Sequence, residues 1–589
     1  MRGKPPFIHH SAFIVRQFFR GGSIVERLKS KTFIIAAAAL VVVGLAAALL
    51  ARPTKAQNPR LERLLPTDTI GFVEVNDLRA QALKVIESEA WREFSKENSA
   101  ASSLFMLTAN HAGALDASYA VALLGVGPGE DGRPEPQFAV VAQFDGWEAR
   151  RTFERRVLSL VREDQQKGVE TKTEEYAGAK LNLVTKEGKH GFAYAYANEL
   201  LVVSNTAEAV KRVLDVRAGK LPSLETNQTF AQARARAGSV DGMFGFLDGA
   251  ALTRLVDSAP APADAGQKVA AFRQLFHGVG APSVQAVAFT SAFEDGRVAE
   301  RFSVVAPNRE GVLATVAQNP PTEQKLLALV PDTAVQALDA SIANAPQTFE
   351  QMLALLGEVS AQSGAHKSPE DALSEFTEKT GVDLRGEILG ALGPEVCVAQ
   401  LASGEEREGL ILLDVRDEQA FTRALAKFAE SKKREVTERE YKGVAVRRAA
   451  GENGKGVEYA FVGATFVASP SGGAIERVID TAQGGRSLKG SAAYQAAAAQ
   501  AQGPAQFVYF NSNADYLNRL GRTLKGGEHE FKTEGQRAAL RPSFAFGATR
   551  ADGFYVESRT PLGTFPRLLA AVASKLGDEN EKQERHGGE

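Results

Sequence analysis

Histidine and cysteine are the residue types in this chain best suited to metal binding and proton transfer. No two histidines beyond residue 51 are close enough in sequence to form a local metal motif such as HExxH. We therefore expect them in loops or on the surface, and we read the adjacent His9 and His10 as an incidental pair. The eight histidines are His9, His10, His111, His190, His277, His366, His529 and His586.

The single cysteine, Cys397, excludes an internal disulfide and any cysteine-based zinc or iron–sulfur site. Its sequence context, EVCVA, predicts a buried strand in which the thiol packs as a small apolar side chain. Ser469 stands before a predicted helix without a G-x-S-x-G motif, so helix capping explains it better than nucleophilic catalysis. Carboxylates at other predicted helix entries, such as Asp145 and Asp417, suit the positive end of the helix dipole.

Two glycine-rich segments resemble phosphate-binding loops only superficially. The glycines of 125–129 are followed by an acidic stretch that proline interrupts, whereas a phosphate loop must open a helix. Residues 451–456 lack the spacing and the Ser/Thr of a P-loop. We read both as connections between strands. The sequence thus holds no recognisable catalytic constellation, cofactor site or metal site, and we expect a protein that is not an enzyme.

The chain has 589 residues, and its 69 lysines and arginines nearly balance its 71 aspartates and glutamates. Its length predicts several domains, and its net charge of −2 gives no reason to expect nucleic acid as a partner.

An internal repeat organises most of the chain. Residues 204–215, SNTAEAVKRVLD, and 469–480, SPSGGAIERVID, share five of twelve residues at a spacing of 265. The same spacing pairs Tyr176-Ala177-Gly178 with Tyr441-Lys442-Gly443. At slightly different spacings 64–75 resembles 328–338, and 282–304 resembles 541–560. We interpret this as a tandem duplication, broken near Pro320-Pro321.

Within each copy, strand-like and helix-like patterns alternate. Phe192, Tyr194 and Tyr196 alternate with alanines as in a strand, and 207–218 follows a capping residue and stops at Gly219 as a helix does. Tight turns such as Glu294-Asp295-Gly296 require antiparallel pairing. The predicted fold class is α+β: an N-terminal transmembrane helix, then two homologous units, each a large, mainly antiparallel sheet with amphipathic helices on one face.

The N-terminal region predicts membrane insertion. Residues 33–51 contain no charged side chain, and 19 residues of helix measure about 28 Å, close to the thickness of the bilayer core. The side chains expected to form this anchor are Phe33, Ile34, Ile35, Leu40, Val41, Val42, Val43, Leu45, Leu49 and Leu50. Residues 1–32 carry seven basic residues against one acidic residue, including the flanking Arg27, Lys29 and Lys31, which predicts a cytoplasmic N-terminus and an exported body. A cleaved signal peptide, with its site at Thr54-Lys55-Ala56, is the alternative.

These observations divide the chain into segments. We expect a basic cytoplasmic stub at 1–32, a transmembrane helix at 33–51, a linker at 52–62, units at 63–320 and 322–575, and a disordered tail at 576–589.

The opening LLPTDTIGFVEVNDL, the segment TGVDLRGEILGALGPEVCVAQL (380–401) and the paired Tyr-x-Gly turns resemble a bacterial family of exported or membrane-anchored proteins, known only as a domain of unknown function. That family has a Leu-Pro-Ala-Asp-Thr-like opening and a Gly-Val-Asp-Leu…Leu-Gly-x-Glu-Val stretch. The resemblance covers nearly all of 60–575 and implies export, but it supplies no catalytic residues. The first unit departs from the pattern at 111–123.

The sequence therefore favours a single-pass protein of the bacterial cytoplasmic membrane whose periplasmic body binds an envelope protein or organises an assembly. The alternative is a periplasmic binder or carrier of lipid or another apolar ligand, held on the concave face of a large sheet. An enzyme with dispersed site residues is a third, weaker hypothesis.

Overall fold

The computed structural model describes residues 60–563 apart from gaps, of which the longest are 93–116, 155–168 and 514–539. The membrane anchor predicted at 33–51, its basic flank and the predicted tail at 576–589 lie outside the described residues.

The described chain is built on a 20-stranded sheet in which every observed strand pairing is antiparallel. The strands of its first half are β1 (Gly71–Val75), β2 (Ala117–Pro128), β3 (Pro134–Phe144), β4 (Val169–Tyr176), β5 (Ala179–Lys186), β6 (Lys189–Ala197), β7 (Leu200–Ser204), β8 (Met243–Asp248), β9 (Ala286–Glu294) and β10 (Arg297–Val305). Those of the second half are β11 (Ala334–Ser341), β12 (Leu392–Ser403), β13 (Glu406–Val415), β14 (Val436–Tyr441), β15 (Val444–Ala450), β16 (Gly456–Val462), β17 (Thr465–Ser469), β18 (Phe507–Asn511), β19 (Ser543–Arg550) and β20 (Gly553–Thr560).

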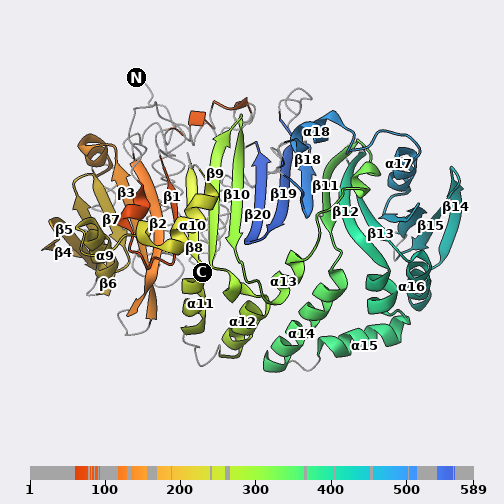
Figure 1. The fold of residues 1–589 in the computed structure, drawn as a ribbon, viewed down its shortest axis with the longest axis horizontal. Helices are drawn as coiled ribbons and strands as arrows, with labels where there is room; N and C mark the ends of the chain where they lie inside the picture. The colour runs from red at the N-terminus through yellow and green to blue at the C-terminus, as the bar shows by residue number, and fades with distance from the viewer. Residues whose placement is uncertain are drawn as a thin grey trace, which may run out of the picture.

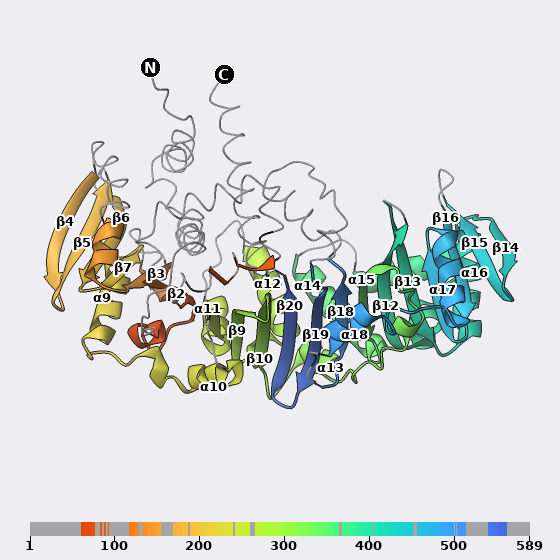
Figure 2. The same cartoon turned by 90° about the horizontal axis from the view of Figure 1, so that it is seen from above.

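The two halves have the same strand order, arranged in opposite directions across the sheet (Figure 1). From one edge to the other the order is β4-β5-β6-β7-β3-β2-β1-β8-β9-β10, then β20-β19-β18-β11-β12-β13-β17-β16-β15-β14. The halves join where β10 pairs with β20. Figure 2 shows that the sheet curves, so that its end strands β4 and β14 lie on the same side of the central strands.

Helices connect the strands and pack on the sheet. They are α9 (Ala207–Arg217), α10 (Gln228–Ala237), α11 (Gly249–Ser258), α12 (Gly266–Gly278), α13 (Gly311–Ala317), α14 (Ala345–Ser363), α15 (Pro369–Thr380), α16 (Glu418–Ser431), α17 (Gly472–Ala482) and α18 (Ala492–Ala498). Short helical turns include η1 (Leu61–Leu64) and η5 (Leu326–Ala328).

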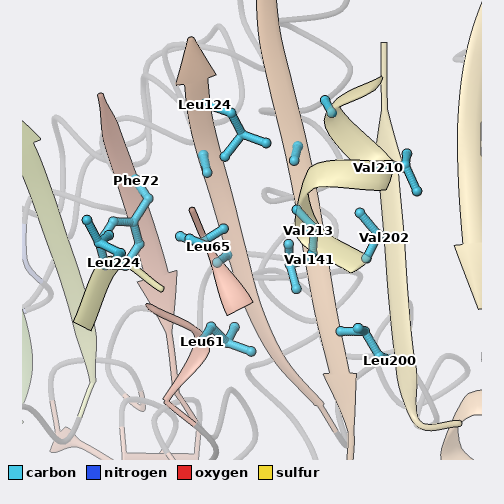
Figure 3. Close-up of a cluster of buried hydrophobic side chains, with 14 of the residues drawn as sticks. Leu61, Leu65, Phe72, Leu124, Val141, Leu200, Val202, Val210, Val213 and Leu224 are labelled. Atoms are coloured by element: carbon cyan, nitrogen blue, oxygen red, sulfur yellow. The ribbon is translucent and has the colours of Figure 1, made fainter. Parts of the chain in front are cut away.

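Helix α9 illustrates how the sequence produces this packing. Thr206 caps it by accepting a hydrogen bond from the backbone N–H of Ala209 at 3.2 Å. Val210 and Val213, on one face of the helix, pack against the sheet residues Val141 and Val202 (Figure 3). In the second half, α17 has the same position along the chain and buries Ile475, Val478 and Ile479.

Each half has its own main core on one face of the sheet, beneath α9 and α10 in the first half and α17 and α18 in the second. We call this side the core face. In the first half it includes an aromatic cluster of Phe72, Phe230, Phe244 and Phe246, with ring centroids 5.2–6.3 Å apart. The α+β content of the prediction is therefore correct.

Three other parts of the predicted fold class need correction. The sequence predicted a separate sheet in each unit, but β10 and β20 join the strands into one sheet. The physical reason is that an edge strand carries unpaired backbone N–H and C=O groups, and another edge strand satisfies them. The sequence pattern of one unit cannot reveal which edges will meet.

The second correction concerns the helices, which cover both faces of the sheet rather than one. Helix α16 packs Phe421 against Phe466 on the face opposite the core face, and Phe153 does the same against Phe144. The predicted N-terminal transmembrane helix is the third part. In the part of the chain that the structure describes, no helix combines the length and the apolar character needed to cross a bilayer.

Candidate functional site

The face of the sheet opposite the core face presents two rows of apolar side chains. In an antiparallel sheet, directly paired residues project to the same side, so the strand register identifies the members of each row. Leu338, Val398 and Ile411 are direct partners on β11, β12 and β13. Their exposed fractions are 40%, 47% and 45%. Three large aliphatic side chains in one row across adjacent strands are thus partly open to solvent.

The second row lies on the first half and ends at β10, the strand that joins the second half. Val73 on β1 pairs with Gly245, which pairs with Phe289, which in turn pairs with Phe302 on β10. The rings of Phe289 and Phe302 lie 4.6 Å apart, and Phe302 is 45% exposed. We call the two rows together the apolar face: Val73, Phe289, Phe302, Leu338, Val398 and Ile411.

The neighbours of these residues along each strand explain why they are exposed. Phe72, Ala337 and Cys397 precede Val73, Leu338 and Val398 respectively, and all three are buried in the main cores. Because side chains alternate along a strand, one apolar residue builds the core and the next must lie on the other side. A solvated sheet face would ordinarily carry polar residues at these positions. Cys397 is completely buried, as its sequence context predicted.

Behind the apolar face lies a buried carboxyl group in each half. Glu74 follows Val73, Asp339 follows Leu338, and neither side chain is exposed. Burial, reinforced by the neighbouring Glu62, raises the pKa of Glu74 to about 8. Burial and the neighbouring Glu395 likewise raise the pKa of Asp339 to about 8. Both groups are therefore mainly protonated at neutral pH.

Different groups stabilise the two acids. Asn76 donates a hydrogen bond to Glu74 at 3.3 Å, and Arg234 lies 3.4 Å from the same carboxyl oxygen. Asp339 accepts a hydrogen bond from the Thr322 hydroxyl at 2.7 Å. Because both carboxyls are shut off from solvent, a substrate cannot reach them, and we interpret them as structural rather than catalytic groups.

A third polar cluster lies on the core face where the two halves meet. Arg301 on β10 forms two hydrogen bonds with Glu294, at 2.7 and 2.9 Å, and lies 3.5 Å from Glu557 on β20. Glu557 also accepts hydrogen bonds from Tyr555 at 2.6 Å and Arg559 at 3.0 Å. A depression of about 150 Å³ borders this cluster between Phe544, Phe546, Glu557 and Arg559. That volume is below the ~300 Å³ from which ligand pockets usually start.

Most of the residues singled out from the sequence are not described by the structure. The anchor residues and the topology-determining Arg27, Lys29 and Lys31 lie outside the described part of the chain. Among the histidines, His277 contacts Asp257 at 2.8 Å on the protein surface. Across the residues that the structure describes, no three His, Cys, Asp or Glu side chains group closely enough to hold a metal ion.

Glu74 and Asp339 were missed at the sequence level although a signal was present. The repeat spacing of 265 that pairs Tyr176 with Tyr441 also pairs these two acids, and an acid within a repeated apolar strand is unusual. The similarity traced between 64–75 and 328–338 stopped one residue before Asp339.

Comparison with known proteins gives one family match. No curated protein and no solved structure matches this chain. One family does match, and its description is a protein of unknown function. The match begins near the end of β10 and includes most of the second half. Residues 304–533 are thus similar to the family described as a protein of unknown function, DUF3352.

Proposed function

We propose that this protein acts without catalysis, by binding a partner protein through the apolar face. The single observation that carries the proposal is the exposed row Leu338, Val398 and Ile411, aliphatic side chains between 40% and 47% exposed on three adjacent strands. Contiguous apolar surface of this kind is characteristic of interaction sites. Removing it from water by binding a partner is favourable by about 25 cal/mol for each Å² covered.

The chemistry of the face defines the partner. The row is aliphatic rather than charged, so the partner surface that covers it must also be apolar. The centres of specific protein–protein interfaces are likewise poor in charged residues. The apolar side of an amphipathic helix is a partner surface of this chemistry.

The second part of the proposal concerns location. We place the body on the periplasmic side of the bacterial cytoplasmic membrane, with residues 1–32 on the cytoplasmic side. Support comes from the seven basic residues that precede the uncharged segment 33–51. A periplasm-specific reporter fused at the C-terminus tests the location, and activity of a cytoplasm-specific reporter at the same position would contradict it.

The binding proposal is tested by photo-cross-linking in intact cells, with a photoreactive amino acid in place of Val398. Cross-linked partners should be lost when Leu338 and Ile411 are both changed to glutamate, because two buried charges would oppose the apolar contact. Val436→Glu is the matched control, since Val436 is 39% exposed on the edge strand β14, away from the row. Adducts that persist in the double variant, or that disappear equally in the control, would contradict the proposal.

A further inference from the structure

The strands that join the two halves are equivalent members of the duplicated fold. In each half a two-residue turn closes the last hairpin: Asp295-Gly296 between β9 and β10, and Ala551-Asp552 between β19 and β20. Strands β10 and β20 then pair antiparallel over eight residues. Two equivalent strands that pair antiparallel are related by an approximate twofold axis perpendicular to the sheet.

The register places one residue pair on that axis. Arg301 is the fourth residue after Arg297, the first residue of β10, and Glu557 is the fourth residue after Gly553, the first residue of β20. Arg301 and Glu557 therefore occupy the same position in their strands, and they are also direct partners. If two identical strands paired in this register, two copies of the same residue would face each other at this position.

We propose that the Arg301–Glu557 pair selects the pairing of β10 with β20 and opposes the pairing of like strands from two copies of the chain. Backbone hydrogen bonds between edge strands are the same for any sequence, so the choice of partner must come from side chains. Pairing β10 with a second β10 in this register would place Arg301 opposite Arg301. Pairing β20 with a second β20 would place Glu557 opposite Glu557.

Burial makes this charge selection effective. Glu557 is 3% exposed and the Arg301 side chain 22% exposed, so water screens their interaction less than it would screen a surface pair. Arg559, 16% exposed, adds a second guanidinium beside Glu557. In a pair of β20 strands, two such carboxylates would face each other in a largely buried position.

The opposite side of the same strands favours the same choice. On the apolar face, Phe302 pairs with Val556, while Glu300 pairs with Ser558, whose hydroxyl lies 3.4 Å from the Glu300 carboxylate. A symmetric pair of β10 strands would instead place the Glu300 carboxylate opposite Phe302. At the positions next to the axis, the observed pairing therefore matches apolar Phe302 with apolar Val556 and polar Glu300 with polar Ser558. This inference does not depend on the function proposed above.

The test uses the full-length chain with Phe302→Cys and Val556→Cys, which lie directly opposite each other, and a short thiol-specific cross-linker. The native Cys397 is completely buried and should react little. Into this background we would introduce Arg301→Glu, Glu557→Arg, and both together. Each single reversal should slow cross-linking within the chain about tenfold or more, because it creates a buried like-charge pair. The double reversal should restore it in part, because the pair on the axis is again complementary while Glu294 and Arg559 then face like charges.

Mixing the two single variants gives a second, independent readout. Arg301→Glu leaves two acidic residues at the paired positions of β10 and β20, and Glu557→Arg leaves two basic residues there. When the two variants are mixed, β10 of either chain carries the charge opposite to that of β20 in the other chain. The mixture should therefore yield cross-linked heterodimers that neither variant forms alone. Arg486→Glu, a reversal at a side chain that is 89% exposed and forms an ion pair with Asp332, is the control and should cross-link like the parent.

Should a reversal prevent folding, the neutral changes Arg301→Met and Glu557→Gln remove each charge without reversing it. They should allow cross-links between chains that the parent lacks. The proposal is overturned if the single reversals cross-link at the parental rate, if the double reversal is as slow as the single ones, or if the folded neutral variants show no cross-links between chains.

Discussion

Arg234 lies 3.4 Å from the fully buried carboxyl group of Glu74, with its guanidinium 4.2 Å from the centre of the Phe244 ring. This contact ties α10 to β1 and lowers the pKa of Glu74, although burial and Glu62 raise it more. The stability of the first half should therefore depend on pH through this group.

Glu74 should make the protein less stable as pH rises. Its pKa is about 8 in the folded state against 4.5 for an ordinary glutamate. Between those values the unfolded chain has lost the proton and the folded chain keeps it, so stability is highest below pH 4.5, falls up to about pH 8 and then levels off.

Glu74→Gln should remove this dependence and stabilise the protein at pH 9 by on the order of 2–4 kcal/mol. Denaturant titrations from pH 5 to 9 measure it, with the exposed Glu225→Gln as control. Parallel profiles for wild type and Glu74→Gln would refute the assignment.

Asp339 provides the same test in the second half, where its pKa of about 8 compares with 3.8 for an ordinary aspartate. Asp339→Asn should flatten the corresponding part of the profile, and the effects of the two variants should add, because they lie in separate cores. Strong non-additivity would show that the two halves do not titrate independently.

Removing Arg234 should extend the pH range over which stability falls, whereas Glu74→Gln should remove that fall. Without the guanidinium the pKa of Glu74 rises further, so in Arg234→Met the fall in stability should continue to a higher pH than in wild type. The same denaturant titrations measure the end of this fall. A profile that levels off at lower pH than wild type would contradict the predicted role of Arg234.

The aromatic cluster should account for a large part of the stability of the first core. Phe244 is completely buried against Phe72 and Phe230, so Phe244→Ala should lower the free energy of unfolding by about 3–5 kcal/mol. Phe302→Ala, at a residue 45% exposed on the apolar face, should cost about 1 kcal/mol or less. Equal losses for the two would mean that the apolar face is packed like a core.

Gly553 should be needed at the junction of the halves. A Cβ atom at this position would collide with the carbonyl oxygen of Val304, on the neighbouring strand β10. Gly553→Ala should therefore destabilise the protein by about 1–3 kcal/mol. Gly409→Ala, in β13 with no atom within 4 Å of the added methyl group, is the matched control and should have little effect. Thermal unfolding of both variants measures the difference.

Local features could be predicted from the sequence because local residues determine them. The turn expected at Glu294-Asp295-Gly296 connects β9 and β10, and the helix expected after Thr206 is α9, which ends at Arg217. These predictions rest on turn chemistry, capping and periodicity.

Non-local features could not be predicted in this way. The pairing of β10 with β20 depends on two edges that are more than 240 residues apart, and the sequence of either strand alone is compatible with several partners. The exposure of Val398 and Ile411 could not be predicted either. An apolar residue in a strand gives the same sequence pattern whether its face of the sheet is covered or exposed to solvent.

The most direct measurement of the central claim is binding at the apolar face. Full-length protein carrying the photoreactive residue at position 398 should form a discrete adduct with a partner protein in intact cells, and Leu338→Glu with Ile411→Glu should abolish that adduct while leaving thermal stability near that of wild type. Retention of the adduct by the folded double variant, or the failure of wild type to form any, would contradict the account.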